Sequence, residues 1–346
     1  MMSTESKPGS FGPAQFRRKN VQLSSARLVR ISDPAPATVP LKIEPNIEGL
    51  RLITWAEHNG EFINTHLLRH GAILFRDFQV AGVSDFEEFV RTVSGDLLNY
   101  EDRTSPRRPV KGNVFSSTYY PPEQEIFLHN ENSYSHTWPL KIFFHCAQPA
   151  DEGGETPIAD VRRIYQRLSP SLRDNFTRKK VMYVRNFGNG FGLTWQDAFQ
   201  TRNPAKVEEF CRNSGIEFEW KAQGRLKTRQ VRPVVAIHPI TNERVWFNHA
   251  AFFHVSTLEP AVREALLTNF AEEDLPYNTY YGDGSPIEPG VLDEIRRAYR
   301  EEAIYFPWQK GDVLMLDNML TAHGRSSFVG PREILAAMSE PRINTD

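Results

Sequence analysis

Hydrophobic and polar positions follow helical and then strand-like patterns in the first part of the chain. From Ile47 to His70 the apolar residues recur at helical spacing, and the run stops at Gly71, a residue favoured just past helix ends. Ala72–Phe75 is a short apolar block typical of a buried strand. Ser84, with Glu87 three residues later, predicts the N-cap of a second amphipathic helix.

After residue 109 the pattern changes to short blocks of branched and aromatic residues, which favour strands. The predicted strands are Asn113–Thr118, Ile126–His129, Leu140–Cys146, Val231–Ile237, Asp312–Leu316 and Arg332–Met338. One helix is predicted between Ile164 and Phe176. Strands at both ends of this region suit a jelly roll better than a doubly wound parallel sheet.

The fold class predicted from these elements is mainly β with helical insertions around a double-stranded β-helix, or jelly-roll, core. We expect residues 1–30 to form a flexible tail, because Gly, Ser, Pro and Lys crowd the first positions. Residues 31–346 are predicted to form a single domain with a large insert at about 183–300.

Charge, cysteine content and the absence of long apolar runs argue against several classes of protein. The 346 residues carry 41 Lys and Arg against 43 Asp and Glu, with no long basic block that would indicate nucleic-acid binding. Cys146 and Cys211 lack the spacing of a structural zinc site. The first residues lack an apolar core of signal-peptide length, and we find no run long enough to span a bilayer. The expectation is a cytoplasmic protein without nucleic-acid or membrane partners.

Three residues could form a metal centre. His129 and Glu131 are two positions apart, so on a β-strand their side chains would point to the same face. A distant histidine, His323, would complete a set of two histidines and one carboxylate. That set leaves one face of the metal open, as in non-haem Fe(II) oxygenases. A lone buried histidine is also compatible with ordinary core packing.

Residues near this set indicate an anion site. Thr156 follows the turn Gly153-Gly154, and its hydroxyl could donate to a carboxylate. The alternative interpretation is that this turn is a plain hairpin without a binding role. Arg332 begins an apolar strand, and a buried guanidinium needs an anionic partner. Its planar fork suits the distal carboxylate of a dicarboxylate.

Several passages together resemble the TauD/TfdA family of Fe(II)- and 2-oxoglutarate-dependent dioxygenases, particularly its SyrP-like branch from natural-product pathways. The matching passages, which extend from about Leu67 to Met338, are HGAILFRDF, FLHNENSYSHTWP, GGETPIAD, WFNHAAFFH, YYGDGSPI and GDVLMLDNMLTAHGRSSFVGPREIL.

The resemblance implies that His129, Glu131 and His323 hold Fe(II), and that Arg332 and Thr156 bind the cosubstrate 2-oxoglutarate, with O2 as oxidant. Arg332 follows His323 at a slightly shorter spacing than in taurine enzymes, so Arg325 remains a competitor for the anchoring role.

The resemblance also narrows the reaction. Taurine enzymes carry a second arginine where this chain has Ala336, which makes taurine a doubtful substrate. Related halogenases lose the carboxylate that Glu131 retains, so hydroxylation is favoured over chlorination. The implied substrate is a small amino acid or amino-acid derivative, free or tethered to a carrier protein, hydroxylated at an aliphatic carbon.

Two alternatives stay open at this point. A zinc hydrolase could use the same three ligands, although it would give no role to Thr156 and Arg332. A jelly-roll binding protein without catalysis is the second alternative. Tyr134 and Asn248 are candidate substrate contacts, because Tyr134 directly follows the ligand strand and Asn248 lies in an aromatic segment, but either could instead fill the core. The sequence leaves the oligomeric state open.

Overall fold

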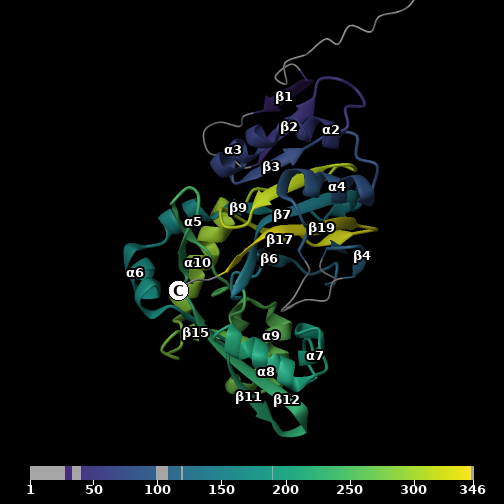
Figure 1. Cartoon of the computed structure of the whole chain (residues 1–346). Helices are drawn as coiled ribbons and strands as arrows, with labels where there is room; N and C mark the ends of the chain where they lie inside the picture. Colours follow the sequence, from purple (N-terminus) through teal and green to yellow (C-terminus); the bar gives the residue numbers. More distant parts are fainter. Residues whose placement is uncertain (1–27, 33–39, 99–107, 118–119, 189, 344–346) are drawn as a thin grey trace, which may run out of the picture.

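The computed structural model describes residues 28–32, 40–98, 108–117, 120–188 and 190–343 (Figure 1). The predicted tail over residues 1–30 lies outside the described residues except for its last three. The division into this tail and one domain stays a prediction.

The larger layer of the fold is an eight-stranded sheet. Its strand order is β1-β2-β3-β16-β7-β19-β5-β4. The bounds are β1 Val29–Ser32, β2 Leu41–Pro45, β3 Ala72–Phe75, β16 Val313–Asp317, β7 Thr137–Gln148, β19 Glu333–Ile343, β5 Val114–Ser116 and β4 Pro109–Lys111. Only β2 and β3 pair in parallel, and the other neighbours are antiparallel. The continuous apolar character of β3 and β16 fits their full burial.

A smaller layer lies beside this sheet. It contains β6 Ile126–His129, β17 Thr321–Arg325 and β9 Ile158–Asp160, with the short pair β8 Glu152–Gly153 and β18 Phe328–Val329. Ile158 of the smaller layer belongs to the same apolar cluster as Phe144 and Leu314 of the larger sheet. Figure 1 shows β6, β9 and β17 beside β7 and β19. This arrangement confirms the predicted mainly β, jelly-roll fold with helical insertions.

The N-terminal helices cover the outer part of the large sheet. They are α2 Leu52–Ala56, α3 Gly60–His70 and α4 Val83–Ser94. The single helix predicted from Ile47 to His70 is wrong: it is divided before α3, where the Asn59 side chain donates to the Trp55 carbonyl at 2.7 Å. Gly71 ends α3 with φ of 73°, as predicted.

The predicted N-cap of the next helix is also wrong. Gly82, with φ of 77°, occupies the N-cap position of α4, and Ser84 lies inside the helix. Asp85 instead accepts a hydrogen bond from the backbone N–H of Ala81 at 2.9 Å. A glycine tolerates this backbone conformation without the strain that a β-carbon would cause.

The insert contains a separate four-stranded antiparallel sheet of order β11-β12-β10-β15. Its strands are β11 Glu217–Lys221, β12 Arg225–Arg232, β10 Val181–Phe187 and β15 Tyr277–Tyr281. Around it lie α7 Trp195–Ala198, α8 Pro204–Asn213 and α9 Pro260–Asn269, seen in the lower part of Figure 1. Short 3-10 turns occur at η1 Ala222–Gly224, η2 Val255–Thr257 and η3 Glu272–Asp274.

The remaining helices and a hairpin connect this insert to the jelly roll. They are α5 Val161–Arg167, α6 Pro170–Lys179, α10 Pro289–Glu302, β13 Val235–Ile237 and β14 Arg244–Trp246. The predicted helix from Ile164 to Phe176 is two helices, because Pro170 starts α6 at a position where its missing N–H is tolerated. The predicted strand Val231–Ile237 is divided between β12 and β13 around Pro233, which cannot donate to a sheet ladder.

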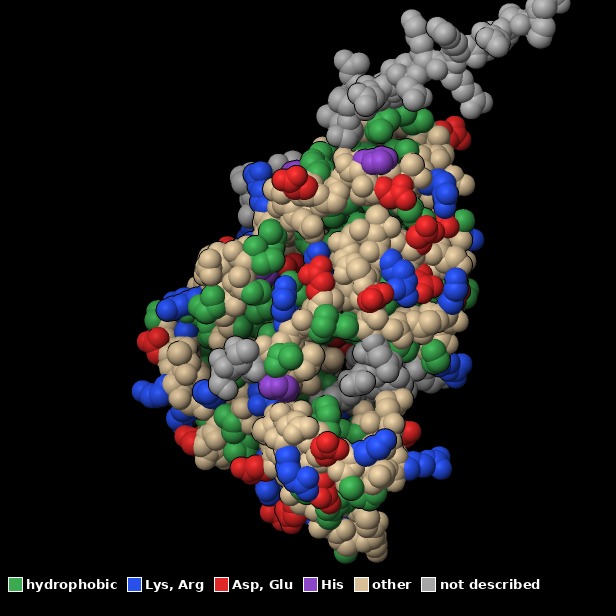
Figure 2. Space-filling view, in the orientation of Figure 1, with side chains coloured by type: hydrophobic (Ala, Val, Ile, Leu, Met, Phe, Trp, Pro, Cys, Tyr) green, Lys and Arg blue, Asp and Glu red, His purple; other side chains and the backbone are tan. Residues whose placement is uncertain are grey.

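The surface shows no dominant charge on the face that Figure 2 presents, where basic and acidic side chains are interspersed. This matches the near-neutral formal charge of -2. Among the described residues, no helix has both the length and the apolar character required to cross a membrane.

Candidate active site

His129, Glu131 and His323 meet at one end of the smaller sheet. Their ligand atoms all lie within 4.8 Å of one another. The antiparallel pairing of β6 with β17 sets His129 opposite His323, and the two imidazole centroids are 4.6 Å apart. His323 Nε2 lies 3.7 Å from a Glu131 carboxylate oxygen. The strand pairing thus brings together residues that are far apart in the sequence.

The hydrogen bonds of the imidazoles suit a divalent cation. Nδ1 of His129 lies 2.8 Å from the Phe127 carbonyl, which can only accept, so Nδ1 carries the proton and Nε2 is left as a ligand atom. Metal-binding histidines commonly donate their second N–H in this way. Nδ1 of His323 is buried and has no hydrogen-bond partner among the described residues. Two imidazoles and one carboxylate are a donor set that fits Fe(II).

Glu131 reaches this site from a turn, which corrects the prediction that it shares a strand face with His129. β6 ends at His129, and residues 131–134 form a turn. Asn318 holds this turn: its Oδ1 accepts from the Glu131 backbone N–H at 2.8 Å, and its Nδ2 donates to the Glu131 carbonyl at 2.9 Å. The same Nδ2 donates to the Pro139 carbonyl at 2.8 Å. Asn318 is fully buried, and its role at this turn was not predicted from the sequence.

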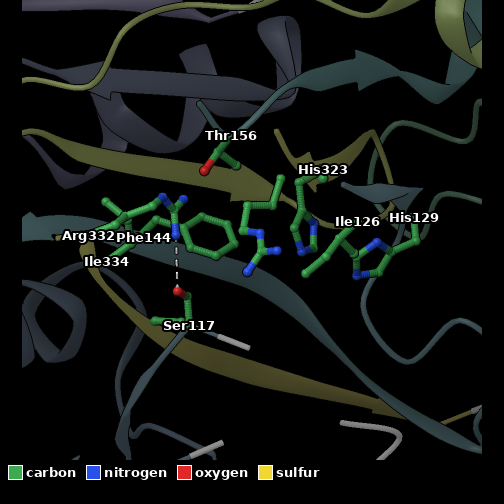
Figure 3. A pocket seen from close by; sticks show the side chains of 11 residues that line it. Ser117, Ile126, His129, Phe144, Thr156, His323, Arg332 and Ile334 are labelled. Atoms are coloured by element: carbon green, nitrogen blue, oxygen red, sulfur yellow. Dashed lines mark hydrogen bonds between the residues drawn. The ribbon is translucent and has the colours of Figure 1, made fainter. Parts of the chain in front are cut away.

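A pocket next to the histidines contains the residues of the predicted anion site. Ser117, Thr156, Arg325 and Arg332 line it together with His129, His323 and apolar residues from both sheets. Figure 3 shows the two histidines at one end and Arg332 with Ser117 at the other. Phe144, Ile334 and Ala336 supply apolar walls from the large sheet. The pocket can therefore hold a small molecule with one end at the metal site and an anionic end at Arg332.

The two arginines in this pocket differ in what they bind. Arg325 donates from Nη1 and Nη2 to the carbonyls of Tyr120, Pro121 and Gln124, at 2.9, 2.6 and 2.7 Å, and so holds that loop. Arg332 donates from Nε to the Gly154 carbonyl at 2.8 Å and from Nη1 to Ser117 Oγ at 3.3 Å. Most of the Arg332 fork remains available to a ligand, because guanidinium carries five N–H donors.

Arg332 also has an electrostatic reason to bind an anion. Within the described part of the chain no carboxylate pairs with it. Burial, together with the like charge of Arg325, lowers its pKa to about 10, which still leaves it cationic at neutral pH. Bringing a carboxylate to this guanidinium offsets the cost of burying its charge.

The other side of the metal centre is aromatic. The ring of Phe252 lies nearly parallel to His129, with centroids 4.5 Å apart. His249 is buried with its ring 5.6 Å from that of His129, and Nδ1 lies 2.6 Å from Ser133 Oγ. Burial, and secondarily the charge of nearby His129, holds the pKa of His249 well below its ordinary value, so this imidazole is neutral.

The predicted substrate residues lie near this aromatic side but differ in what their polar groups bind. Tyr134 is buried, and its ring lies 5.0 Å from His249. The Asn248 side chain donates to the Val234 carbonyl at 3.0 Å and accepts from the Ala250 backbone N–H at 2.9 Å. Asn248 thus holds the backbone of the segment that presents His249, and substrate contacts from Tyr134 and Asn248 stay predictions.

Comparisons with known proteins place the chain in a family. The model of the family described as "Taurine catabolism dioxygenase TauD, TfdA family" matches residues 35–338. The dapdiamide synthesis protein DdaC of Enterobacter agglomerans is 38% identical over 286 residues, which cover 81% of this chain and 87% of that protein. The clavaminate synthase-like protein At3g21360 of Arabidopsis thaliana is 31% identical over 290 residues, covering 80% and 84%.

Solved structures share the fold at low sequence identity. PvcB of Pseudomonas aeruginosa matches with a TM-score of 0.56 at 16% identity, covering 95% of this chain and 100% of PvcB. AAD-2, solved with Mn(II) and N-oxalylglycine, matches with a TM-score of 0.55 at 12% identity, covering 92% and 99%. The chain belongs to the TauD/TfdA family and is an Fe(II)- and 2-oxoglutarate-dependent dioxygenase.

Proposed function

We propose that His129, Glu131 and His323 bind the Fe(II) and that Arg332 and Thr156 bind the distal carboxylate of 2-oxoglutarate. The observation that supports this assignment is one pocket lined by His129, His323 and Arg332. The Arg332 guanidinium makes two hydrogen bonds there and keeps its other N–H groups available to a ligand. Ser117 lies within the same pocket and adds a hydroxyl beside Arg332. Arg325 contributes positive charge while it holds the loop of Tyr120 to Gln124.

The chain's own residues prepare the site for oxidation of a C–H bond. Bound Fe(II) and 2-oxoglutarate supply the oxidation of an aliphatic carbon by O2, with CO2 and succinate as coproducts. Arg332 and Thr156 fix the orientation of the cosubstrate, and Asn318 fixes the backbone of Glu131. Phe252, His249 and Tyr134 form an aromatic group beside His129, where their rings would shield the reacting carbon from water.

The substrate we propose is an amino acid or an amino-acid derivative of a natural-product pathway, free or tethered to a carrier protein. The name of the relative DdaC refers to the synthesis of dapdiamide, and PvcB is described as an oxygenase from an isonitrile synthetic pathway. Membership of the SyrP-like branch stays a prediction, and it implies the same class of amino-acid substrate. Taurine is disfavoured, because Ala336 is buried and lines the pocket where taurine enzymes carry an arginine.

A substrate screen tests this function. The purified protein, supplied with Fe(II), ascorbate, O2 and 2-oxoglutarate, is incubated with amino acids as free acids and as carrier-bound thioesters. We expect one class to raise succinate formation above the substrate-free rate and to gain one oxygen atom by mass spectrometry. Succinate formation that no member of either class stimulates would contradict the proposed substrate class.

Two further assays separate the alternatives at the same ligands. A zinc hydrolase would contain zinc after purification and would show no visible charge-transfer band on anaerobic addition of Fe(II) and 2-oxoglutarate. Turnover of the wild type in the presence of chloride tests the choice of hydroxylation, and the Glu131→Ala and Glu131→Gly variants show whether chlorination requires loss of the carboxylate. We expect the wild type to give only oxygenated product, and chlorinated product from the wild type would overturn that choice.

A further inference from the structure

Trp308 contacts the cosubstrate pocket from outside. It lies between α10 and β16, is 8% exposed, and belongs to the apolar cluster that fills the space between the two sheets. Its ring packs edge-on against Phe306, with centroids 5.6 Å apart. Its indole N–H donates to the hydroxyl of Thr156 at 3.1 Å. A tryptophan far away in the sequence thus contacts one predicted cosubstrate residue directly.

This hydrogen bond determines what the Thr156 hydroxyl can do. An indole N–H can only donate, so Thr156 Oγ1 must act as the acceptor in this pair. The hydroxyl keeps one proton to donate, and among the described residues none accepts a hydrogen bond from it. Thr156 is 3% exposed and lines the pocket, so an acceptor that enters the pocket can take this proton.

We propose that Trp308 is a positioning residue for 2-oxoglutarate, which it orients by committing the Thr156 hydroxyl to donate. The inference rests on the proposed role of Thr156 as a cosubstrate residue. A hydroxyl that is held by a donor presents its proton to a carboxylate without first turning away from another acceptor. Trp308 therefore favours an anionic acceptor over a neutral donor at this point of the pocket.

The test compares binding rather than turnover. Trp308→Phe removes the N–H while the aromatic ring still fills the cluster, and Trp55→Phe is the matched control. Trp55 lies in a different apolar cluster, and its indole nitrogen has no hydrogen-bond partner among the described residues. The affinity for 2-oxoglutarate is measured by anaerobic titration of the Fe(II) protein, and folding is checked by thermal melting.

We expect Trp308→Phe to weaken 2-oxoglutarate binding by about three- to tenfold, as for loss of one hydrogen bond, and Trp55→Phe to leave it unchanged. Thr156→Val should weaken binding at least as much, and adding Trp308→Phe to Thr156→Val should cause no further loss. Unchanged affinity in Trp308→Phe, with weakened affinity in Thr156→Val, would reduce Trp308 to a packing role. Unchanged affinity in Thr156→Val would instead overturn the assignment of Thr156.

A second measurement covers the case in which Trp308→Phe does not fold. The chain has 6 tryptophans, so the Zn(II)-loaded protein labelled with 15N-tryptophan gives a small set of indole N–H signals. We expect one signal to shift in Thr156→Val and the same signal to move when 2-oxoglutarate is added to the wild type. Indole signals that all stay in place in Thr156→Val would contradict the hydrogen bond itself.

Discussion

The two sides of the candidate metal centre use different chemistry. On the side proposed to bind the cosubstrate, called the cosubstrate side below, Arg332, Thr156 and Ser117 present hydrogen-bond donors held by specific partners. On the opposite side, Phe252 and His249 present rings packed against His129. The first arrangement suits an anionic ligand by charge and donor geometry, whereas the second offers ring surfaces to an apolar part of a ligand.

Because the two sides differ in chemistry, variants on each side should change a different binding event. Residues on the cosubstrate side should control affinity for 2-oxoglutarate, and residues on the aromatic side should control the substrate. The ligands and Asn318 lie between the two sides, so their variants should impair both.

The largest effect is expected from loss of a ligand. His323→Ala should lower Fe(II)-dependent succinate formation by more than about 100-fold, because even outer residues of metal sites cost about 10- to 100-fold when mutated. Metal content and succinate are measured together. His58→Ala, on an exposed histidine, is the matched control and should retain activity. Succinate formation in His323→Ala at the wild-type rate would refute the metal assignment.

The next largest effect is expected from replacing Arg332, and replacing Arg325 should act on a different property. Arg332→Gln should raise the Kd for 2-oxoglutarate roughly 10- to 100-fold, as for loss of charge-assisted hydrogen bonds to a carboxylate. Arg325→Gln should act mainly on stability, since its guanidinium holds the carbonyls of Tyr120, Pro121 and Gln124. Anaerobic titration and thermal melting measure the two effects. A larger rise in Kd for Arg325→Gln would make Arg325 the anchor.

Asn318→Ala tests the region between the two sides. Removing its amide frees the Glu131 turn, and we expect about tenfold weaker Fe(II) binding, as for other residues that orient ligands. Equilibrium dialysis with Fe(II) under anaerobic conditions gives the affinity. Asn269→Ala, at the exposed end of α9, provides the control. Wild-type Fe(II) affinity in Asn318→Ala would limit this residue to holding the fold.

Phe252→Leu should give the smallest loss of function, and it should affect substrate binding while leaving 2-oxoglutarate binding nearly unchanged. The substitution keeps an apolar wall but loses the stacked ring, so we expect the KM for the substrate to rise by about three- to tenfold. The affinity for 2-oxoglutarate should change by less than about twofold. Phe191→Leu, on an exposed ring, is the control. Equal losses in both affinities would break the division into two sides.

Local patterns in the sequence predicted the strands of the jelly roll and the end of α3 at Gly71 well. They failed where a hydrogen bond from a nearby side chain or a positive backbone φ sets a helix boundary. The helix before α3 is interrupted where Asn59 bonds to Trp55, and Gly82 rather than Ser84 starts α4. The insert could not be resolved, because β10 pairs with β12 and β15, which follow it at long sequence separations.

The candidate site shows the same limit. His129, Glu131 and His323 converge as predicted, but Glu131 does so through a turn rather than through strand alternation. Asn318 and Trp308 carry no signal in the sequence, since their roles depend on partners far away along the chain. Asn318 could have been noted only by its place near His323 in the same passage.

The proposed site binds Fe(II) through His129, Glu131 and His323 and binds 2-oxoglutarate through Arg332 in the adjoining pocket. Anaerobic titration of the purified protein with Fe(II) and then 2-oxoglutarate tests it most directly. We predict a visible charge-transfer band that saturates at stoichiometric metal, is absent in His323→Ala, and requires a higher 2-oxoglutarate concentration in Arg332→Gln. A band of unchanged intensity and midpoint in both variants would contradict the claim.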